Sequence, residues 1–148
     1  MYQQQFSLKL PLLGLMSRQQ FEEKLTDAII GEATSAELYT RLLKEAPDKL
    51  HGKFLEQARD DELEHLKYFE KLYYTYMGTG AQYKVKEVQY PSYKEGIFMA
   101  LEDELKTAKF YKDMQMSVKD QLIRDTFFFA MVDELVHATQ LSTLFNKL

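Results

Sequence analysis

Residues 61–65 read Asp-Glu-Leu-Glu-His, and residues 133–137 read Asp-Glu-Leu-Val-His. The two motifs lie 72 positions apart, and the same shift places Glu32 on Glu104. Each half of the chain therefore contains a glutamate, a second glutamate 30 residues later and a histidine three residues after that. Repeated ligand-type residues at fixed offsets are typical of a two-metal site between the helices of a bundle.

Length and composition are those of a single globular domain. The chain has 148 residues, 45% of them apolar, which is enough for a sizeable core. A net charge of −4 argues against a nucleic-acid partner, because phosphate binding needs clustered Lys and Arg. The absence of cysteine excludes disulfides, zinc–thiolate sites and iron–sulfur clusters, and it is compatible with a cytoplasmic location.

The N-terminal segment, residues 1–16, is expected to be an arm outside the domain formed by residues 17–148. It lacks the basic stretch that opens a secretory signal, and its apolar part is too short to span a bilayer. The arm could pack on a neighbouring subunit, or it could be a loose end or a local flap over its own bundle. We expect no membrane partner and a cytoplasmic protein.

Residues typical of helix starts and helix ends predict four long helices. Ser17 and Ser92 each stand three residues before a Gln or Glu, which is the capping-box pattern at a helix start. Pro47 suits the first turn of the second helix, and Ser117 is expected to begin the fourth. The predicted helices span approximately residues 17–45, 47–76, 92–116 and 117–148.

Loop lengths predict the topology. The turns after the first and third helices are short, so each of these helices should lie antiparallel to the next one. Residues 77–91 are too many for a hairpin turn and suit a long crossover between the second and third helices. Residues 83–88 alternate in polarity as a strand would, but a lone strand has nothing to pair with. The predicted fold class is all-α, an antiparallel four-helix bundle with this crossover.

Glutamate and histidine three positions apart on a helix can reach one metal ion. Glu37 and Glu102 are rival candidates, but the repeat aligns them with Lys109 and Ile30, so symmetry favours Glu32 and Glu104. The candidate metal ligands, which are also the candidate catalytic residues, are Glu32, Glu62, His65, Glu104, Glu134 and His137. They stand in apolar helical stripes, where an ionised carboxylate costs several kcal/mol to bury. Two divalent cations would neutralise four such charges.

Four other polar residues in or near the motifs have two interpretations each. Asp61 and Asp133 are expected to accept hydrogen bonds from the ligand imidazoles across the bundle, with ordinary surface acids as the alternative. Tyr39 and Tyr111, which also align under the shift, are either core aromatics or proton and electron relays at the site. His51 lacks an acidic counterpart at ligand spacing and is expected on the surface.

With these motifs in hand, the chain resembles the ferritin-like di-iron carboxylate superfamily over about residues 18–147. Gly31-Glu32 followed by Tyr39, the two Asp-Glu-x-x-His motifs and the long crossover carry the resemblance. It implies a ferritin-like bundle in which the six residues bind two iron ions, with one histidine on each and two bridging carboxylates. Manganese is also compatible with these ligands.

Two differences from well-known members of this superfamily limit which of them the chain resembles. Rubrerythrins usually carry a cysteine-ligated rubredoxin iron and a further glutamate on the third helix, whereas this chain has no cysteine and has Thr107 one turn after Glu104. Bacterioferritins bind haem through a methionine where this chain has Leu63. A chain of the rubrerythrin-like and bacterioferritin-like type, without a rubredoxin domain, is therefore expected.

The sequence is compatible with three functions. The first is an oxidoreductase of peroxidase or ferroxidase type that reduces peroxide or dioxygen with an external electron donor. The second is a non-catalytic iron-handling protein of ferritin type, and the third is an enzyme resembling manganese catalase. A homodimer is expected from the resemblance.

Overall fold

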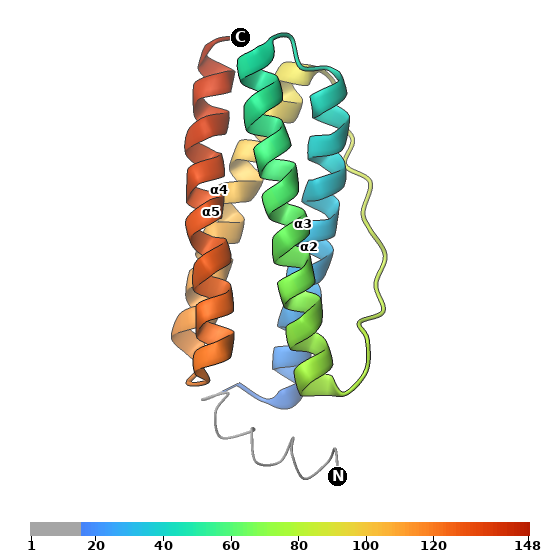
Figure 1. The fold of residues 1–148 in the computed structure, drawn as a ribbon, viewed down its shortest axis with the longest axis vertical. Helices are drawn as coiled ribbons and strands as arrows, with labels where there is room; N and C mark the ends of the chain where they lie inside the picture. The colour runs from blue at the N-terminus through green and yellow to red at the C-terminus, as the bar shows by residue number, and fades with distance from the viewer. Residues whose placement is uncertain (1–15) are drawn as a thin grey trace.

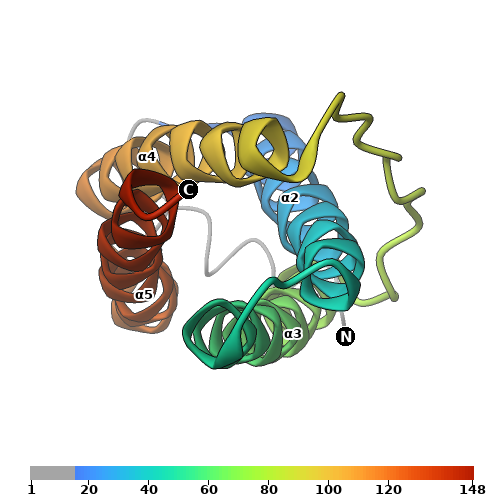
Figure 2. The same ribbon diagram turned by 90° about the horizontal axis from the view of Figure 1, so that it is seen from above.

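The computed structural model describes residues 16–148, and in this range the chain forms four helices and no strand. The helices pack side by side as a four-helix bundle (Figures 1 and 2), which confirms the predicted all-α architecture. Almost all of the predicted N-terminal arm lies outside the described residues. The helices are α2 (Arg18–Lys44), α3 (Lys49–Met77), α4 (Tyr93–Ser117) and α5 (Gln121–Asn146).

The bundle consists of two antiparallel hairpins, α2 with α3 and α4 with α5. The connection from α3 to α4 runs the length of the molecule, so that α4 begins at the end of the bundle where α3 also begins (Figure 1). Further contacts join α3 to α5 and α2 to α4, which closes the bundle around a central axis (Figure 2). No helix in residues 16–148 is long and apolar enough to cross a membrane.

The connection between α3 and α4 is the predicted crossover, and residues 83–88 form no strand. Two hydrogen bonds tie it to α2. The Lys86 amide donates a hydrogen bond to Thr34 Oγ1 at 3.2 Å. The Arg41 guanidinium donates to the Val88 carbonyl at 2.6 Å. These two bonds place the crossover against the outer side of α2.

Aspartates begin two of the helices at positions that the sequence prediction missed. Asp48 caps α3 by accepting from the His51 amide, so Pro47 precedes the helix and does not occupy its first turn. Asp120 caps α5 in the same way, and Ser117 is the last residue of α4. An ionised carboxylate accepts strongly from the free amides of a first turn, which explains why each aspartate is the cap. The predicted capping box at Ser17 is present.

The core has two apolar parts, one on each side of a polar layer at mid-bundle. One part contains Phe21, Phe69 and Phe127, which lie toward the start of α2. The other contains Leu42, Leu55, Ile97, Leu141 and Leu144, toward the opposite end. Along every helix, the predicted ligands fall between residues of these two parts. The fold therefore encloses the polar layer in apolar surroundings at both ends.

Candidate metal centre

Seven polar or charged side chains are buried in residues 16–148, and six of them are the predicted metal ligands. Each of the six is at most 3% exposed. One comes from α2, two from α3, one from α4 and two from α5, so every helix contributes. The six are Glu32, Glu62, His65, Glu104, Glu134 and His137.

The six side chains form two overlapping groups of four. In one group, ligand atoms of Glu32, Glu62, His65 and Glu134 all lie within 4.8 Å of one another. In the other group, Glu104 and His137 replace Glu32 and His65, with the same 4.8 Å limit. Glu62 and Glu134 belong to both groups, which is the arrangement of two adjacent cation positions sharing two carboxylates.

Each imidazole turns its Nδ1 atom toward the carboxylates. His65 Nδ1 lies 3.3 Å from Glu32 Oε2 and 3.2 Å from Glu134 Oε1. The two rings are stacked with their centroids 6.4 Å apart. His137 follows the same plan, with its Nδ1 3.3 Å from Glu62 Oε1 and 3.4 Å from Glu104 Oε1.

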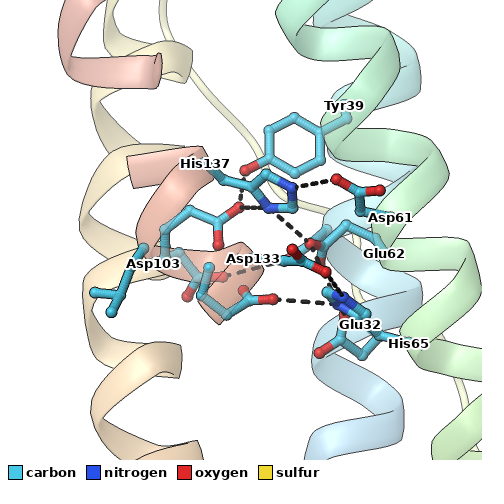
Figure 3. A network of polar contacts seen from close by, with 12 residues as sticks. Glu32, Tyr39, Asp61, Glu62, His65, Asp103, Asp133 and His137 are labelled. Atoms are coloured by element: carbon cyan, nitrogen blue, oxygen red, sulfur yellow. Dashed lines mark hydrogen bonds and ion pairs between the residues drawn. The ribbon is translucent and has the colours of Figure 1, made fainter. Parts of the chain in front are cut away.

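The opposite nitrogen of each imidazole is held by an aspartate from another helix (Figure 3). His65 Nε2 lies 2.9 Å from Asp133 Oδ2, and His137 Nε2 lies 2.9 Å from Asp61 Oδ2. The cross-bundle hydrogen bonds predicted for Asp61 and Asp133 are thus present. Because Nε2 donates to the aspartate, the Nδ1 lone pair is free to face the centre once the ring is neutral.

Two buried tyrosines support the carboxylates from the sides. The Tyr39 hydroxyl donates to Glu104 Oε1, and the Tyr111 hydroxyl donates to Glu32 Oε1. Both rings are also core side chains, with at most 1% exposure. The structure thus confirms that these tyrosines are core aromatics, and their role as relays stays a prediction. Each hydroxyl fixes one oxygen of its glutamate and leaves the other oxygen to the centre.

The cluster contains buried polar atoms that lack a hydrogen-bond partner, which bears on whether it suits a metal. Such atoms are costly in a folded protein unless water or an ion satisfies them. Three are carboxylate oxygens and one is an imidazole nitrogen, which is the donor set that iron and manganese accept. In residues 16–148 they are Glu62 Oε1, Glu104 Oε2, Glu134 Oε1 and His137 Nδ1. The residues present therefore fit a pair of cations.

Burial and mutual repulsion raise the pKa values of the two shared carboxyls in the metal-free protein and so favour their protonated forms. Burial, followed by the charges of Glu32 and Glu134, raises the pKa of Glu62 well above its usual value. Burial and the charge of Glu32 raise the pKa of Glu134 in the same way. Burial also opposes ionisation of Glu104, but the close approach of Glu134 and His137 outweighs it and lowers the pKa of Glu104.

The histidines are more basic than usual despite their burial. Burial lowers the pKa of His65, but hydrogen bonds with Glu32 and Asp133 outweigh it and raise that pKa to about 9. The nearby carboxylates of Glu104 and Asp61 likewise outweigh burial and raise the pKa of His137. Without metal, protons on imidazoles and shared carboxyls thus offset part of the negative charge. A cation that takes their place releases them.

His51 is buried, so the prediction that it lies on the surface was wrong. Its Nδ1 lies 2.7 Å from the Tyr93 hydroxyl, and its exposure is 1%. The ring is enclosed where α3 and α4 begin, a contact between distant segments that local sequence cannot reveal. His51 remains outside both four-residue groups.

Asp103 is a residue near the centre that the sequence prediction did not identify. Ser35 Oγ donates to Asp103 Oδ2 at 3.5 Å, which links α4 to α2 beside Glu104 (Figure 3). Partial removal from water and the charge of Glu104 raise the pKa of Asp103, although its side chain remains open to solvent. The repeat places Asp103 on Gly31, so repeat symmetry could not have pointed to it.

The fold and the site together define a ferritin-like four-helix bundle with a buried carboxylate–histidine cluster arranged for two metal ions. The chain belongs to the rubrerythrin family, whose model matches residues 23–145. Among curated proteins it is similar to the uncharacterized protein YhjR of Bacillus subtilis (strain 168). The two are 30% identical over 114 residues, which cover 77% of this chain and 79% of the relative.

A solved structure confirms the ferritin-like fold. The bundle superposes on the bacterioferritin-related protein of Bacteroides fragilis, described as a dodecameric thioferritin, with a TM-score of 0.81. The match covers 98% of this chain and 94% of that one, at 11% sequence identity. At this identity the likeness concerns the fold alone.

Proposed function

We propose that this protein binds two iron ions at mid-bundle and reduces peroxide or dioxygen there. The observation that carries the proposal is the pair of four-residue groups that share Glu62 and Glu134. Two irons in those positions could each supply one electron to a small oxidant. Membership in the rubrerythrin family supports this function, since the chain resembles proteins that carry out such reductions.

The chain's own residues have distinct roles in this proposal. Glu62 and Glu134 would hold both metals, because they belong to both four-residue groups, while Glu32, His65, Glu104 and His137 would each hold one. Tyr39 holds the Glu104 carboxylate and Tyr111 holds the Glu32 carboxylate, because each hydroxyl donates to one oxygen of its glutamate. Apolar core on both sides of the layer keeps bulk water away from the reacting oxidant.

Electrons must come from another molecule. The chain has no cysteine, so it contains neither a rubredoxin-type iron nor a disulfide that could store reducing equivalents. A soluble reductase or small electron carrier is the partner that the proposed reaction requires. The reaction then consumes two electrons and two protons for each peroxide reduced to two water molecules.

Rapid mixing of reduced, iron-loaded protein with hydrogen peroxide tests the function. We expect iron oxidation to be fast compared with the same concentration of iron(II) in buffer, and repeated turnover when a chemical reductant is added. One stoichiometric oxidation without turnover would contradict the proposal and favour iron handling. Oxygen release without reductant from manganese-loaded protein would instead favour a reaction of the manganese-catalase type.

Asp61→Ala is expected to weaken metal binding about 10–100-fold, the usual cost of removing a group that orients a ligand histidine. The physical reason is that His137 Nε2 loses its 2.9 Å partner, so the ring no longer has a fixed tautomer and orientation. Titration with iron(II) under anaerobic conditions measures the change. Asp60→Ala, which removes an exposed acid one residue away, is the matched control and should bind as the unaltered protein does.

A further inference from the structure

The two four-residue groups at the centre differ in the atoms that they leave free to bind a cation. We name each cation position after its histidine. Glu104 and His137 belong only to the His137 position, and each has a buried atom without a hydrogen-bond partner in residues 16–148. Glu32 and His65 belong only to the His65 position, and neither has such an atom. The 72-residue shift aligns the two pairs, so the difference is between equivalent residues.

The two residues that distinguish the His65 position are bound to each other. His65 Nδ1 and Glu32 Oε2 form a hydrogen bond at 3.3 Å (Figure 3), and the other oxygen of Glu32 accepts from Tyr111. A cation at the His65 position has to separate this pair. Loss of a hydrogen bond with a charged partner weakens binding roughly 10-fold or more. A cation at the His137 position breaks no such bond, because His137 Nδ1 and Glu104 Oε2 are free.

The side chains that cover the two histidines also differ. The Phe129 ring stands edge-on to His65 at 5.8 Å and to Tyr68 at 5.6 Å between centroids. The repeat aligns Phe129 with Gln57, and it aligns Tyr68 with Gln140. These two amides also meet between α3 and α5, since Gln140 Nε2 donates to Gln57 Oε1 at 3.3 Å. One side of the centre is therefore covered by an aromatic pair and the equivalent place on the other side by an amide pair.

The amide pair suits the passage of a cation. Gln140 stands one turn after His137 on α5, and helical side chains lean toward the N-terminus of their helix, so the Gln140 amide lies back toward His137. Gln140 Oε1 is buried and has no hydrogen-bond partner in the part of the chain that the structure describes. A divalent cation that loses water on its way into an apolar layer needs oxygen atoms in exchange. An amide supplies one, whereas a hydrocarbon ring does not.

We infer that the two cation positions fill in a fixed order. The first cation passes between Gln57 and Gln140 and binds at the His137 position. The second cation binds at the His65 position, where it has to separate His65 from Glu32. This inference rests on the metal centre of the proposed function, but not on the reaction of that centre with peroxide.

Titration of the full chain with cobalt(II), whose visible absorbance reports each bound ion, tests the order. We expect two steps of one ion per chain, with the second dissociation constant roughly 10-fold or more above the first. A single step in which two ions bind with equal affinity would overturn the inference.

Matched histidine variants identify the position that fills first, which matters because repulsion between two ions also weakens the second step. His65→Ala should retain the tight first ion and lose the second. His137→Ala should bind its first ion roughly 10-fold or more weakly than the unaltered protein does. Circular dichroism establishes that both variants are folded. Equal losses in the two variants, or the opposite pattern, would overturn the order.

Exchange of the covering side chains tests the route. Gln57→Phe combined with Gln140→Tyr gives the His137 side the aromatic pair of the other repeat. Uptake of the first cobalt(II), followed by stopped-flow absorbance, should then be about 10-fold slower or more, within the range over which association rates vary among related variants. The dissociation constant should stay unchanged. Phe129→Gln combined with Tyr68→Gln is the control and should leave the first uptake unaltered. Normal uptake in the aromatic double variant would overturn the route.

Cobalt(II) binding also separates this inference from the proposed function. If the positions fill in order but the reduced, iron-loaded protein does not react with peroxide, the order stands and the proposed reduction fails. If a protein that turns over peroxide fills both positions equally, the order alone is overturned.

Discussion

Glu62→Ala is expected to lower the metal content from two ions per chain to one or none. Glu62 belongs to both groups of ligands, so its removal takes an oxygen from each cation position. The affinity loss should exceed the roughly 100-fold that follows removal of an outer supporting group. Glu134→Ala should behave in the same way, because the repeat makes the two residues equivalent. Elemental analysis of purified, folded protein measures the stoichiometry.

The control for this prediction lies two residues along the same helix. Glu64 is exposed and points away from both groups, so Glu64→Ala should retain two ions per chain. Circular dichroism establishes that each variant is folded before its metal is counted. If Glu62→Ala and Glu134→Ala both retain the full complement, these glutamates are not ligands.

Removing the metal is expected to lower stability by several kcal/mol. A ligand that binds only the folded state contributes about 4 kcal/mol at a free concentration 1,000 times its dissociation constant. Two cations at that level would contribute about 8 kcal/mol, a large share of the total for a domain of this size. Differential scanning calorimetry before and after dialysis against a chelator measures the change. Unaltered melting after complete removal would contradict a metal-stabilised centre.

The metal-free protein should also become less stable as the pH rises from 6.5 to 9. Hydrogen bonds raise the pKa of His65 to about 9 against burial, so above 6.5 the folded state binds a proton that the unfolded state has lost. The free energy of unfolding falls with pH in that interval. Raised pKa values at Glu62 and Glu134 act in the same direction, beginning at lower pH. The lowered pKa of Glu104 changes the free energy of unfolding with pH only under acidic conditions. Metal-loaded protein should not show this decline, since its ligands are already deprotonated.

The centre could be located from the sequence because its residues repeat. Glutamates and histidines in apolar stripes at a constant 72-residue offset leave few alternatives, and the structure brings all six together. The partner of each imidazole could also be predicted from the sequence, since Asp61 and Asp133 are the first residues of the two motifs. That the six residues bind metal remains a prediction, which the variants above address.

What the sequence did not reveal depends on contacts between distant segments. His51 has the pattern of a surface residue, and its burial against Tyr93 follows from where the ends of two helices meet. Asp103 lacks a counterpart in the other repeat, so nothing marked its bond with Ser35. Helix starts at Asp48 and Asp120 were missed because a nearby proline or serine offered an equally good local signal.

The division of ligands between the two hairpins gives bound metal a mechanical role. Each cation position takes three side chains from one hairpin and a single glutamate from the other. With metal bound, Glu62 and Glu134 would each add a link between the hairpins, which core packing, the hydrogen bonds of Tyr39, Tyr111, His65 and His137, and the crossover already join. Because the chain has no cysteine, no disulfide can link the two hairpins. A pair of bound ions would instead link the two hairpins, and this link could form or be lost with the metal.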